Sequence, residues 1–336
     1  MIRFLLKGLL RDHSRSLFPV LIVAIGVALT VLLQSWIGGV MGDMIRSNAN
    51  FSTGHVKLTT RAYAENEDQI PNDLALLDVG DLLRDVRNRC PGMNFVERIH
   101  FGGLLDIPDE NGETRAQGPV TGQGIDLLSP TTTEIERLNI ENALVRGRMP
   151  TASGEILISD EFARTLQVGP GDPATVLSST MHGSMAMYNF VLVGTVRFGI
   201  GPLDKGAMLA DLGDVRRALD MNDAAGEVLG YFDDGQYHDE EASRIARAFK
   251  ARLDDPTDEF GPLMRALRNQ NDLAEYLDLV NHFTGILSGI FVLAMSIVLW
   301  NLGLISGLRR YGEIGVRLAI GRKRATFIDP CCSKPR

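Results

Sequence analysis

Two long apolar runs, separated by about 240 mostly polar residues, dominate the hydrophobic pattern of the chain. The first covers residues 17–41 and the second covers residues 283–308, and neither contains a charged side chain. As a helix, each run would be about 37 Å long, which is enough to cross a bilayer. Because a water-soluble helix rarely lacks charge over such a length, we predict two transmembrane α-helices.

The charge balance along the chain predicts how these spans are oriented. Residues 1–16 carry a net charge of about +3, residues 309–336 about +6, and residues 17–308 about −17. Basic segments next to a span stay in the cytoplasm, so we expect both termini there and the acidic middle outside. Nucleic acid requires a basic face and is not expected as a partner. Solubility explains the acidity of the middle, and an acidic ligand-binding surface is the alternative.

Residues 1–16 predict an amphipathic helix on the cytoplasmic side. Leu5 and Leu9 lie on one side, whereas Arg3 and Lys7 repeat on another, as in helices of the lipid headgroup layer. The alternative for this segment is a disordered basic leader. A cleaved signal peptide is the alternative for the run that follows. Signal peptides have an apolar core of about 7–15 residues, so the length of the run favours an uncleaved anchor.

The residues between the spans, 42–282, predict an extracytoplasmic α+β domain that ends in a stalk helix. Alternating apolar positions predict strands at 54–59, 94–107, 155–158 and 188–198. Apolar residues at helical spacing predict helices at 74–89, 160–166, 211–219, 240–253 and 263–280, the last of which continues into the second span. Short strands that alternate with helices are typical of the α+β class. The length of this region suits two subdomains better than one.

The sequence contains no catalytic or metal-binding motif that we recognise. It lacks a G-x-x-x-x-G-K-[ST] phosphate loop, an H-E-x-x-H pair and a C-x-x-C pair. Its six histidines show no ligand spacing, and its three cysteines give no disulfide framework. We therefore expect that the chain is not an enzyme and holds no cofactor or metal of its own.

Residues 309–328 follow the second span and predict a short basic helix in the cytoplasm. Glu313 and Arg317 are spaced as an i, i+4 ion pair on this helix. Gly315 and Ala319 are small and would let a second surface approach closely. From the residues alone, a basic anchor for anionic lipid explains the segment equally well.

This segment resembles part of a known family. Residues 310–321 fit the pattern R-x-x-E-I-G-x-x-x-A-I-G of the FtsX-like ABC transporter permeases, which include macrolide-exporter and lipoprotein-releasing types. Three more stretches resemble that family in the same order along the chain, namely 147–150 (G-R-M-P), 154–172 and 190–196. Because these stretches occur in the family's order and between two spans, together they give a stronger resemblance than any one of them gives alone.

The resemblance implies a MacB-like periplasmic core domain in a bacterial inner-membrane protein with cytoplasmic termini. A separate cytoplasmic ABC ATPase would bind ATP, and a second permease subunit would complete a homo- or heterodimer. The residues expected to contact the ATPase are Arg310, Glu313, Ile314, Gly315, Arg317, Ala319, Ile320 and Gly321. Motion would pass along the stalk helix to the outer domain (mechanotransmission), which would act on lipoproteins, lipids or hydrophobic molecules. Membrane lipid and a periplasmic or outer-membrane protein are further expected partners.

The second span also contains residues suited to helix packing. Gly285 with Gly289, and Gly303 with Gly307, form two G-x-x-x-G pairs that permit close helix contact. Asn301 is expected to face protein, because an unpaired amide is costly in lipid. The alternative for the glycines is the ordinary frequency of glycine in membrane helices.

The end of the chain departs from the family, whose members have four spans. Residues 329–336 form an atypical tail, which we interpret as the product of a truncated or frame-shifted coding sequence. Two other functions stay open. One is a non-transporting membrane regulator whose outer domain controls a periplasmic partner such as a cell-wall hydrolase. The other is a two-span sensor.

Overall fold

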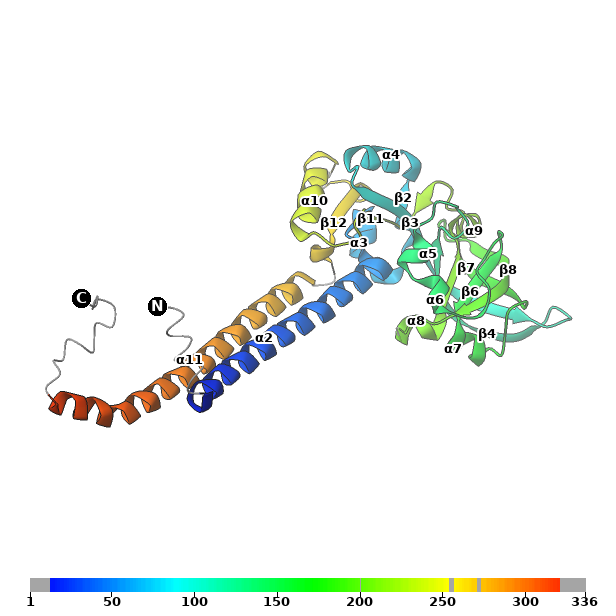
Figure 1. Ribbon diagram of the computed structural model, residues 1–336. Coiled ribbons are helices and arrows are strands. Elements are labelled where there is room, and N and C mark those ends of the chain that lie inside the picture. The colour runs from blue at the N-terminus through cyan, green and yellow to red at the C-terminus, as the bar shows by residue number, and fades with distance from the viewer. Residues whose placement is uncertain (1–12, 200, 254–256, 271–272, 321–336) are drawn as a thin grey trace. The chain divides into compact units, whose positions relative to one another are not determined.

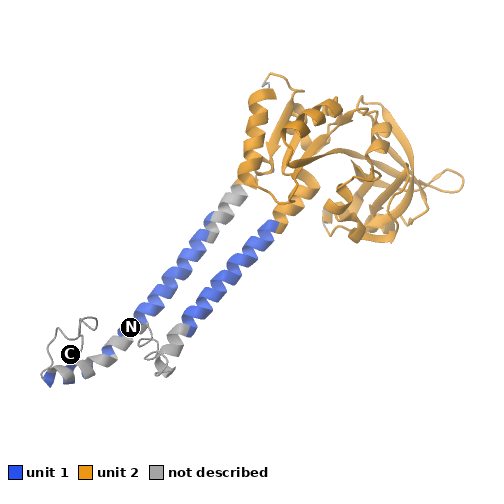
Figure 2. Ribbon diagram, turned by 45° about the horizontal axis from the view of Figure 1, so that its top comes forward, with its two compact units in different colours: residues 1–42, 275–336 blue, residues 43–274 orange. Residues whose placement is uncertain are grey.

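The computed structural model describes residues 13–199, 201–253, 257–270 and 273–320 (Figure 1). The chain divides into two compact units, residues 1–42 with 275–336 and residues 43–274 (Figure 2). We call the first the helical unit and the second the central domain. The predicted amphipathic helix up to residue 12, Gly321 and the tail at 329–336 lie outside the described residues.

Two helices, α2 (His13–Asn48) and α11 (Leu273–Ala319), supply the described residues of the helical unit. They approach closely at Gly26, where an added Cβ atom would lie 2.3 Å from the sulfur of Met295. Further along α2, Thr30 and Ile37 line a small cavity together with Leu287 of α11. Residues later in α2 therefore contact residues earlier in α11, so the two helices pack antiparallel.

One helix of the described chain is long and apolar enough to cross a membrane. It covers Leu21–Thr53, its most apolar stretch has a mean hydropathy of 2.1, and that stretch is not buried within the described structure. An exposed apolar helix near the N-terminus is consistent with membrane anchoring. Gly285–Asn301 is a shorter apolar helical stretch, so the second span over 283–308 stays a prediction.

A single mixed sheet organises the central domain. Its strand order is β12-β1-β11-β3-β4-β9-β6-β8-β5, with β7 pairing to β3 and β8. The strands are β1 (Val56–Thr60), β3 (Met93–Pro108), β4 (Thr114–Ile125), β5 (Leu144–Gly147), β6 (Glu155–Ser159), β7 (Pro173–Ser179), β8 (Met185–Val196), β9 (Ala207–Asp211), β11 (Glu227–Phe232) and β12 (Pro262–Ala266). A separate small ladder joins β2 (Leu76–Leu77) to β10 (Ala224–Ala225).

Helices cover both halves of this sheet. They are α3 (Arg61–Glu65), α4 (Val79–Arg89), α5 (Glu134–Arg137), α6 (Ile140–Ala143), α7 (Asp160–Thr165), α8 (Gly201–Gly206), α9 (Leu212–Leu219) and α10 (Asp239–Leu253). Short 3-10 turns cover Glu67–Gln69, Asn72–Leu74 and Leu267–Asn269, and a π-helical turn covers Ala49–Thr53. One apolar core lies between α4, α10 and the β12-β1-β11 end of the sheet, and includes Leu58 and Phe95. A second core packs α7 and α9 against the other half, and includes Phe101, Ile156 and Phe190.

The central domain is one compact unit, not the two subdomains that its length suggested. Strand β3 explains the difference, because it is 16 residues long and takes part in both halves of the sheet. Its first residues pair with β11, and the residues from Ile99 onward pair with β4. The two cores therefore share a strand.

Most of the predicted elements are confirmed, with one clear error. Strands β1, β3, β6 and β8 and helices α7, α9 and α10 lie where the apolar patterns placed them. The helix predicted at 263–280 is wrong over its first residues, because Pro262–Ala266 form strand β12 and pair with β1. Helix α4 begins at Val79, later than predicted, because the preceding residues form β2. Five residues contain too few apolar positions to reveal the two-residue period of a strand. The helical pattern of the residues that follow was therefore extended over them.

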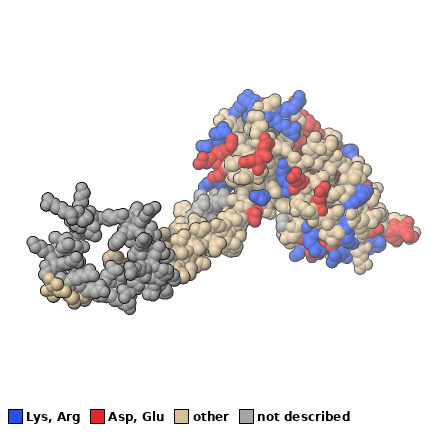
Figure 3. All heavy atoms as spheres, viewed as in Figure 1, with Lys and Arg blue, Asp and Glu red and all other residues tan. Residues whose placement is uncertain are grey.

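Charged side chains of both signs are interspersed over the visible face of the central domain (Figure 3). This mixture is typical of a soluble surface.

Candidate functional site

The predicted coupling residues belong to the last turns of α11 and the residue after it. Arg310, Glu313, Ile314, Gly315, Arg317 and Ala319 are helical, Ile320 follows the helix, and Gly321 lies outside the described residues. Gly315 and Ala319 are exposed, and 80% of the Ile320 surface is exposed. These small and apolar positions are accessible to a partner at the end of the described chain.

Gly285, Gly289 and Gly303, three of the glycines predicted for helix packing, do not contact α2 in the described structure. A Cβ atom at Gly285, Gly289 or Gly303 would meet no described atom within 4 Å. Gly307 lies on the same helix, and the Asn301 side chain is exposed in this chain. The sequence therefore missed the glycine that α11 contacts, which is Gly26. The predicted glycines leave an open helix surface in the described chain.

The root of the central domain is the second candidate region. We define it as the incoming segment, 49–60, and the outgoing segment, 262–270. Strands β1 and β12 pair antiparallel over five residues, from Val56↔Ala266 to Thr60↔Pro262. Beyond this ladder, Leu267 donates its N–H to the His55 carbonyl at 3.1 Å. The two connections to the helical unit are thus hydrogen-bonded to each other.

Gln270 and Tyr231 extend these links at the root. The Gln270 side chain is buried and its Nε2 donates to the Thr53 carbonyl at 3.4 Å. The Tyr231 hydroxyl donates to the Ala49 carbonyl at 3.0 Å, and its ring lies 3.8 Å below the Arg137 guanidinium carbon. The π-helical turn after α2 is therefore held by side chains from two distant parts of the chain.

Gly54 allows the chain to leave this turn and enter β1. Its φ is +61° and its ψ is −175°, a conformation that almost no other residue adopts. Its N–H donates to the Ala49 carbonyl at 2.9 Å and closes the turn. A Cβ atom at this position would lie 2.8 Å from the Val56 carbonyl oxygen. Both backbone conformation and space therefore require glycine here.

Replacing Gly54 by alanine is expected to lower the free energy of unfolding of the central domain by about 2–3 kcal/mol, because the strained backbone must be kept or the turn must open. The measurement is the urea midpoint of the full chain by pulse proteolysis. The matched control is Gly102→Ala, since Gly102 has open space around it. This control should change stability by less than about 0.5 kcal/mol. Equal effects of the two changes would count against a special role for Gly54.

One face of the sheet at the root carries buried charge instead of apolar side chains. Lys57, which is 1% exposed, lies between two carboxylates, and its Nζ is 2.8 Å from Glu227 and in contact with Glu67. Arg265 donates to Glu67 at 2.8 Å, and His100 contacts Glu227 at 2.9 Å. Burial acts against ionisation of Glu227, but Lys57 and His100 outweigh it and hold the pKa of Glu227 far below its usual range.

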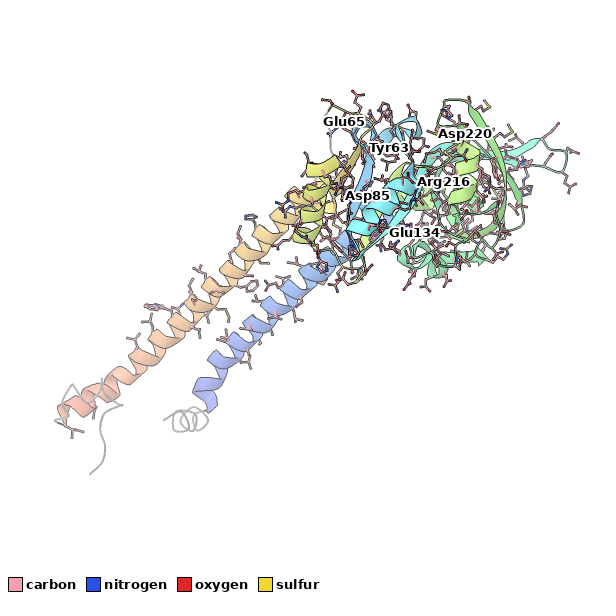
Figure 4. The ribbon with its side chains drawn as sticks, turned by 90° about the horizontal axis from the view of Figure 1, so that it is seen from above. Tyr63, Glu65, Asp85, Glu134, Arg216 and Asp220 are labelled. Atoms are coloured by element: carbon pink, nitrogen blue, oxygen red, sulfur yellow. The ribbon has the colours of Figure 1, made fainter. Side chains whose placement is uncertain are left out.

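A second buried ion pair continues the same face. Arg98 is fully buried, and its Nε donates to Glu134 at 2.6 Å. Arg137 from the same short helix also contacts Glu134, and Arg98 donates to the Tyr231 hydroxyl at 3.3 Å. The chain of contacts therefore runs from Glu134 through Arg98 and Tyr231 to the turn after α2 (Figure 4 labels Glu134).

These buried charges come from strand positions that alternate with core positions. Val56 and Leu58 face the apolar core, so Lys57 faces the other side of the sheet. The sequence analysis missed Lys57, Arg98 and Glu227, because a charged residue in an alternating strand usually faces solvent. Glu227 follows Lys57 by 170 positions, so no local pattern marks the pair.

A hollow of about 400 Å³ opens beside Lys57. Tyr63, Glu65 and His100 contribute to its lining, and Tyr63 and Glu65 are labelled in Figure 4. The buried Lys57–Glu227 pair forms part of its wall.

His55 occupies an aromatic pocket at the root. Only 3% of its surface is exposed, and its ring centroid lies 5.4 Å from those of Tyr231 and Phe232. Its Nδ1 accepts the Phe232 N–H at 3.0 Å, which requires an unprotonated Nδ1. Burial, and secondly the nearby Arg137 charge, lower the pKa of His55 to about 4.

No protein-family model matches the chain, and no curated protein matches it. Among solved structures, it is similar to the crystal structure of the periplasmic region of MacB from Actinobacillus actinomycetemcomitans. The identity is 10% and the TM-score 0.40, over 68% of this chain and 95% of that one. Similarity at this level carries neither a family assignment nor a function to this chain.

Proposed function

We propose that this chain is the permease subunit of an ABC transporter whose ATPase is a separate cytoplasmic protein. In this proposal, nucleotide binding moves the cytoplasmic end of α11, and the central domain does its work outside the membrane. The substrates are lipoproteins, lipids or hydrophobic exported molecules. The support is the pattern at 310–321 together with the way the central domain is joined to two long helices.

The observation that carries the proposal is the continuity of α11. This helix runs without a break from Leu273 to Ala319 and contains no proline. At the helical rise, its 47 residues are about 70 Å long. One helix thus leads from the coupling segment to Leu273, three residues after the end of the root at Gln270, and a rigid helix transmits displacement better than a flexible linker.

The hydrogen bonds of the root also support the proposal. A displacement of α11 reaches β12, which pairs with β1, and β1 begins directly after the turn that follows α2. Displacements of either helix therefore enter adjacent strands of the same sheet. A transport cycle requires that ATP favours one of two arrangements, and this paired root is the element that we propose to respond.

The proposed surroundings of the chain follow from the same mechanism. It lies in a bacterial inner membrane with both termini in the cytoplasm and the central domain in the periplasm. A second permease subunit packs on the open glycines of α11, Gly285, Gly289 and Gly303. The chain itself catalyses no reaction and binds no nucleotide.

A photoreactive amino acid at Ile320 tests the ATPase contact. In native membranes, irradiation is expected to cross-link position 320 to a protein that has a G-x-x-x-x-G-K-[ST] loop and binds ATP. Mass spectrometry identifies the cross-linked protein. Val292 is the matched control, because it is an exposed apolar residue of α11 within the predicted second span. Attachment of the ATPase at Ile320 and not at Val292 supports the proposal. Attachment of a kinase or a hydrolase instead, or of no ATP-binding protein, contradicts it.

A further inference from the structure

The β7–β8 hairpin carries two exposed methionines on one face. Met185 is 82% exposed and Met187 is 65% exposed, whereas Ala186 between them is buried. Their direction is fixed by the ladder with β7, in which Met185 pairs with Ser179 and Met187 with Leu177. Because residues i and i+2 of a strand share a face, both thioethers point to the same side of the hairpin.

The neighbours of the pair argue against an apolar docking surface. Met185 lies opposite Ser179. The next residue on the same face, Asn189, bonds through its side-chain oxygen to the Thr175 hydroxyl at 2.9 Å. A docking surface for an apolar partner needs a contiguous apolar patch, and polar side chains interrupt this one. What Met185 and Met187 share beyond hydrophobicity is a thioether sulfur.

Two thioethers in this arrangement can reach one ion. Side chains two residues apart on a strand start about 6.7 Å from each other. Methionine is unbranched and flexible, so each sulfur can turn toward the space between them. Thioethers are soft donors that select Cu(I) over harder cations. Among the described residues, His, Cys, Asp and Glu form no group of three that would hold a metal ion.

We propose that Met185 and Met187 form a binding site for a soft monovalent cation, Cu(I) or Ag(I). The two sulfurs are the protein ligands, and solvent fills the remaining positions of the ion. His182, in the turn before Met185, is not a ligand in this proposal, because its Nε2 is directed to Asp220 at 3.8 Å. The site is independent of the proposed ATPase contact.

The experiment uses the full chain in nanodiscs with carbon-13 in the methionine methyl groups. On titration with silver nitrate in chloride-free buffer, two of the 12 methionine methyl signals should shift and saturate at one equivalent. The buried Met208 and Met264 serve as internal controls and should not shift. Zinc nitrate should leave all signals in place, because zinc prefers nitrogen, oxygen and thiolate ligands.

Substitutions separate sulfur coordination from apolar contact. Met185→Leu and Met187→Leu keep the apolar volume but remove the sulfur, and each is expected to weaken Ag(I) binding at least tenfold. Val191→Leu is the matched control on the same face of β8 and should leave binding unchanged. The proposal is overturned if the Leu variants bind Ag(I) as the unchanged chain does, or if all methionine signals shift together.

Discussion

Replacing Lys57 by methionine is expected to lower the free energy of unfolding of the central domain by about 3–5 kcal/mol. Glu227 stays buried after the change and loses the ammonium group 2.8 Å from it. A buried carboxylate without its partner is costly, which makes this the largest effect that we expect. Pulse proteolysis of the full chain in urea at pH 7 measures it.

A control variant shows whether the loss of stability is specific to the buried pair. Arg84→Met is the matched control, because Arg84 pairs with Asp81 on the surface and both side chains are more than three-quarters exposed. This change should cost less than about 1 kcal/mol. A loss below about 1 kcal/mol for Lys57→Met would show that the buried pair does not stabilise the root.

The Lys57 effect should also depend on pH in a defined direction. Lys57 and His100 hold the pKa of Glu227 below its unfolded value, so their contribution is present above the ordinary glutamate pKa. This contribution is lost as the pH falls through the pKa of Glu227 in the folded domain. Without Lys57 the pKa of Glu227 rises, so the variant loses less stability on acidification. The difference between the two proteins should therefore shrink as the pH falls toward 4.

Acidification from pH 7 to pH 5 is expected to destabilise the central domain by about 2 kcal/mol through His55 alone. Burial lowers its pKa in the folded domain to about 4, below the ordinary histidine value of 6.5. The unfolded chain therefore binds a proton at pH 5 that the folded domain excludes. The stability that neutral His55 contributes is fully present above about pH 7, decreases as the pH falls below 6.5, and is lost near pH 4.

The His55→Asn variant isolates this contribution. The Asn Oδ1 can accept the Phe232 N–H that Nδ1 accepts now, but it does not titrate. We expect its stability to change about 2 kcal/mol less than that of the unchanged chain between pH 7 and pH 5. Parallel curves for His55→Asn and the unchanged chain would contradict the role of His55.

The sequence was most informative where contacts are local. Helix α7 begins at Asp160, where the Ser159 hydroxyl accepts the Phe162 N–H at 3.1 Å. Such a cap and the apolar residues that follow it are visible in a short window. The turn between β3 and β4 is likewise local, with Gly112 at a φ of +82°.

The sequence was least informative where residues distant along the chain meet. The pairs Lys57–Glu227 and Arg98–Glu134 join strands and helices that no window contains together. The contact between α2 and α11 uses Gly26, which lies in no G-x-x-x-G pair, and the paired glycines of α11 lie open. A small-residue pattern shows that a helix can pack closely but does not identify its neighbour.

The hydrogen bond between Gln270 and Thr53 has a consequence for how such a protein can change over time. The incoming and outgoing segments of the root are hydrogen-bonded at Thr53 and Gln270, so a short bridge would close the chain there if the residues between them were excised. Domains with neighbouring ends tolerate insertion into a host chain. A pair of helices of this kind can therefore exchange one extramembrane module for another while its own packing stays intact.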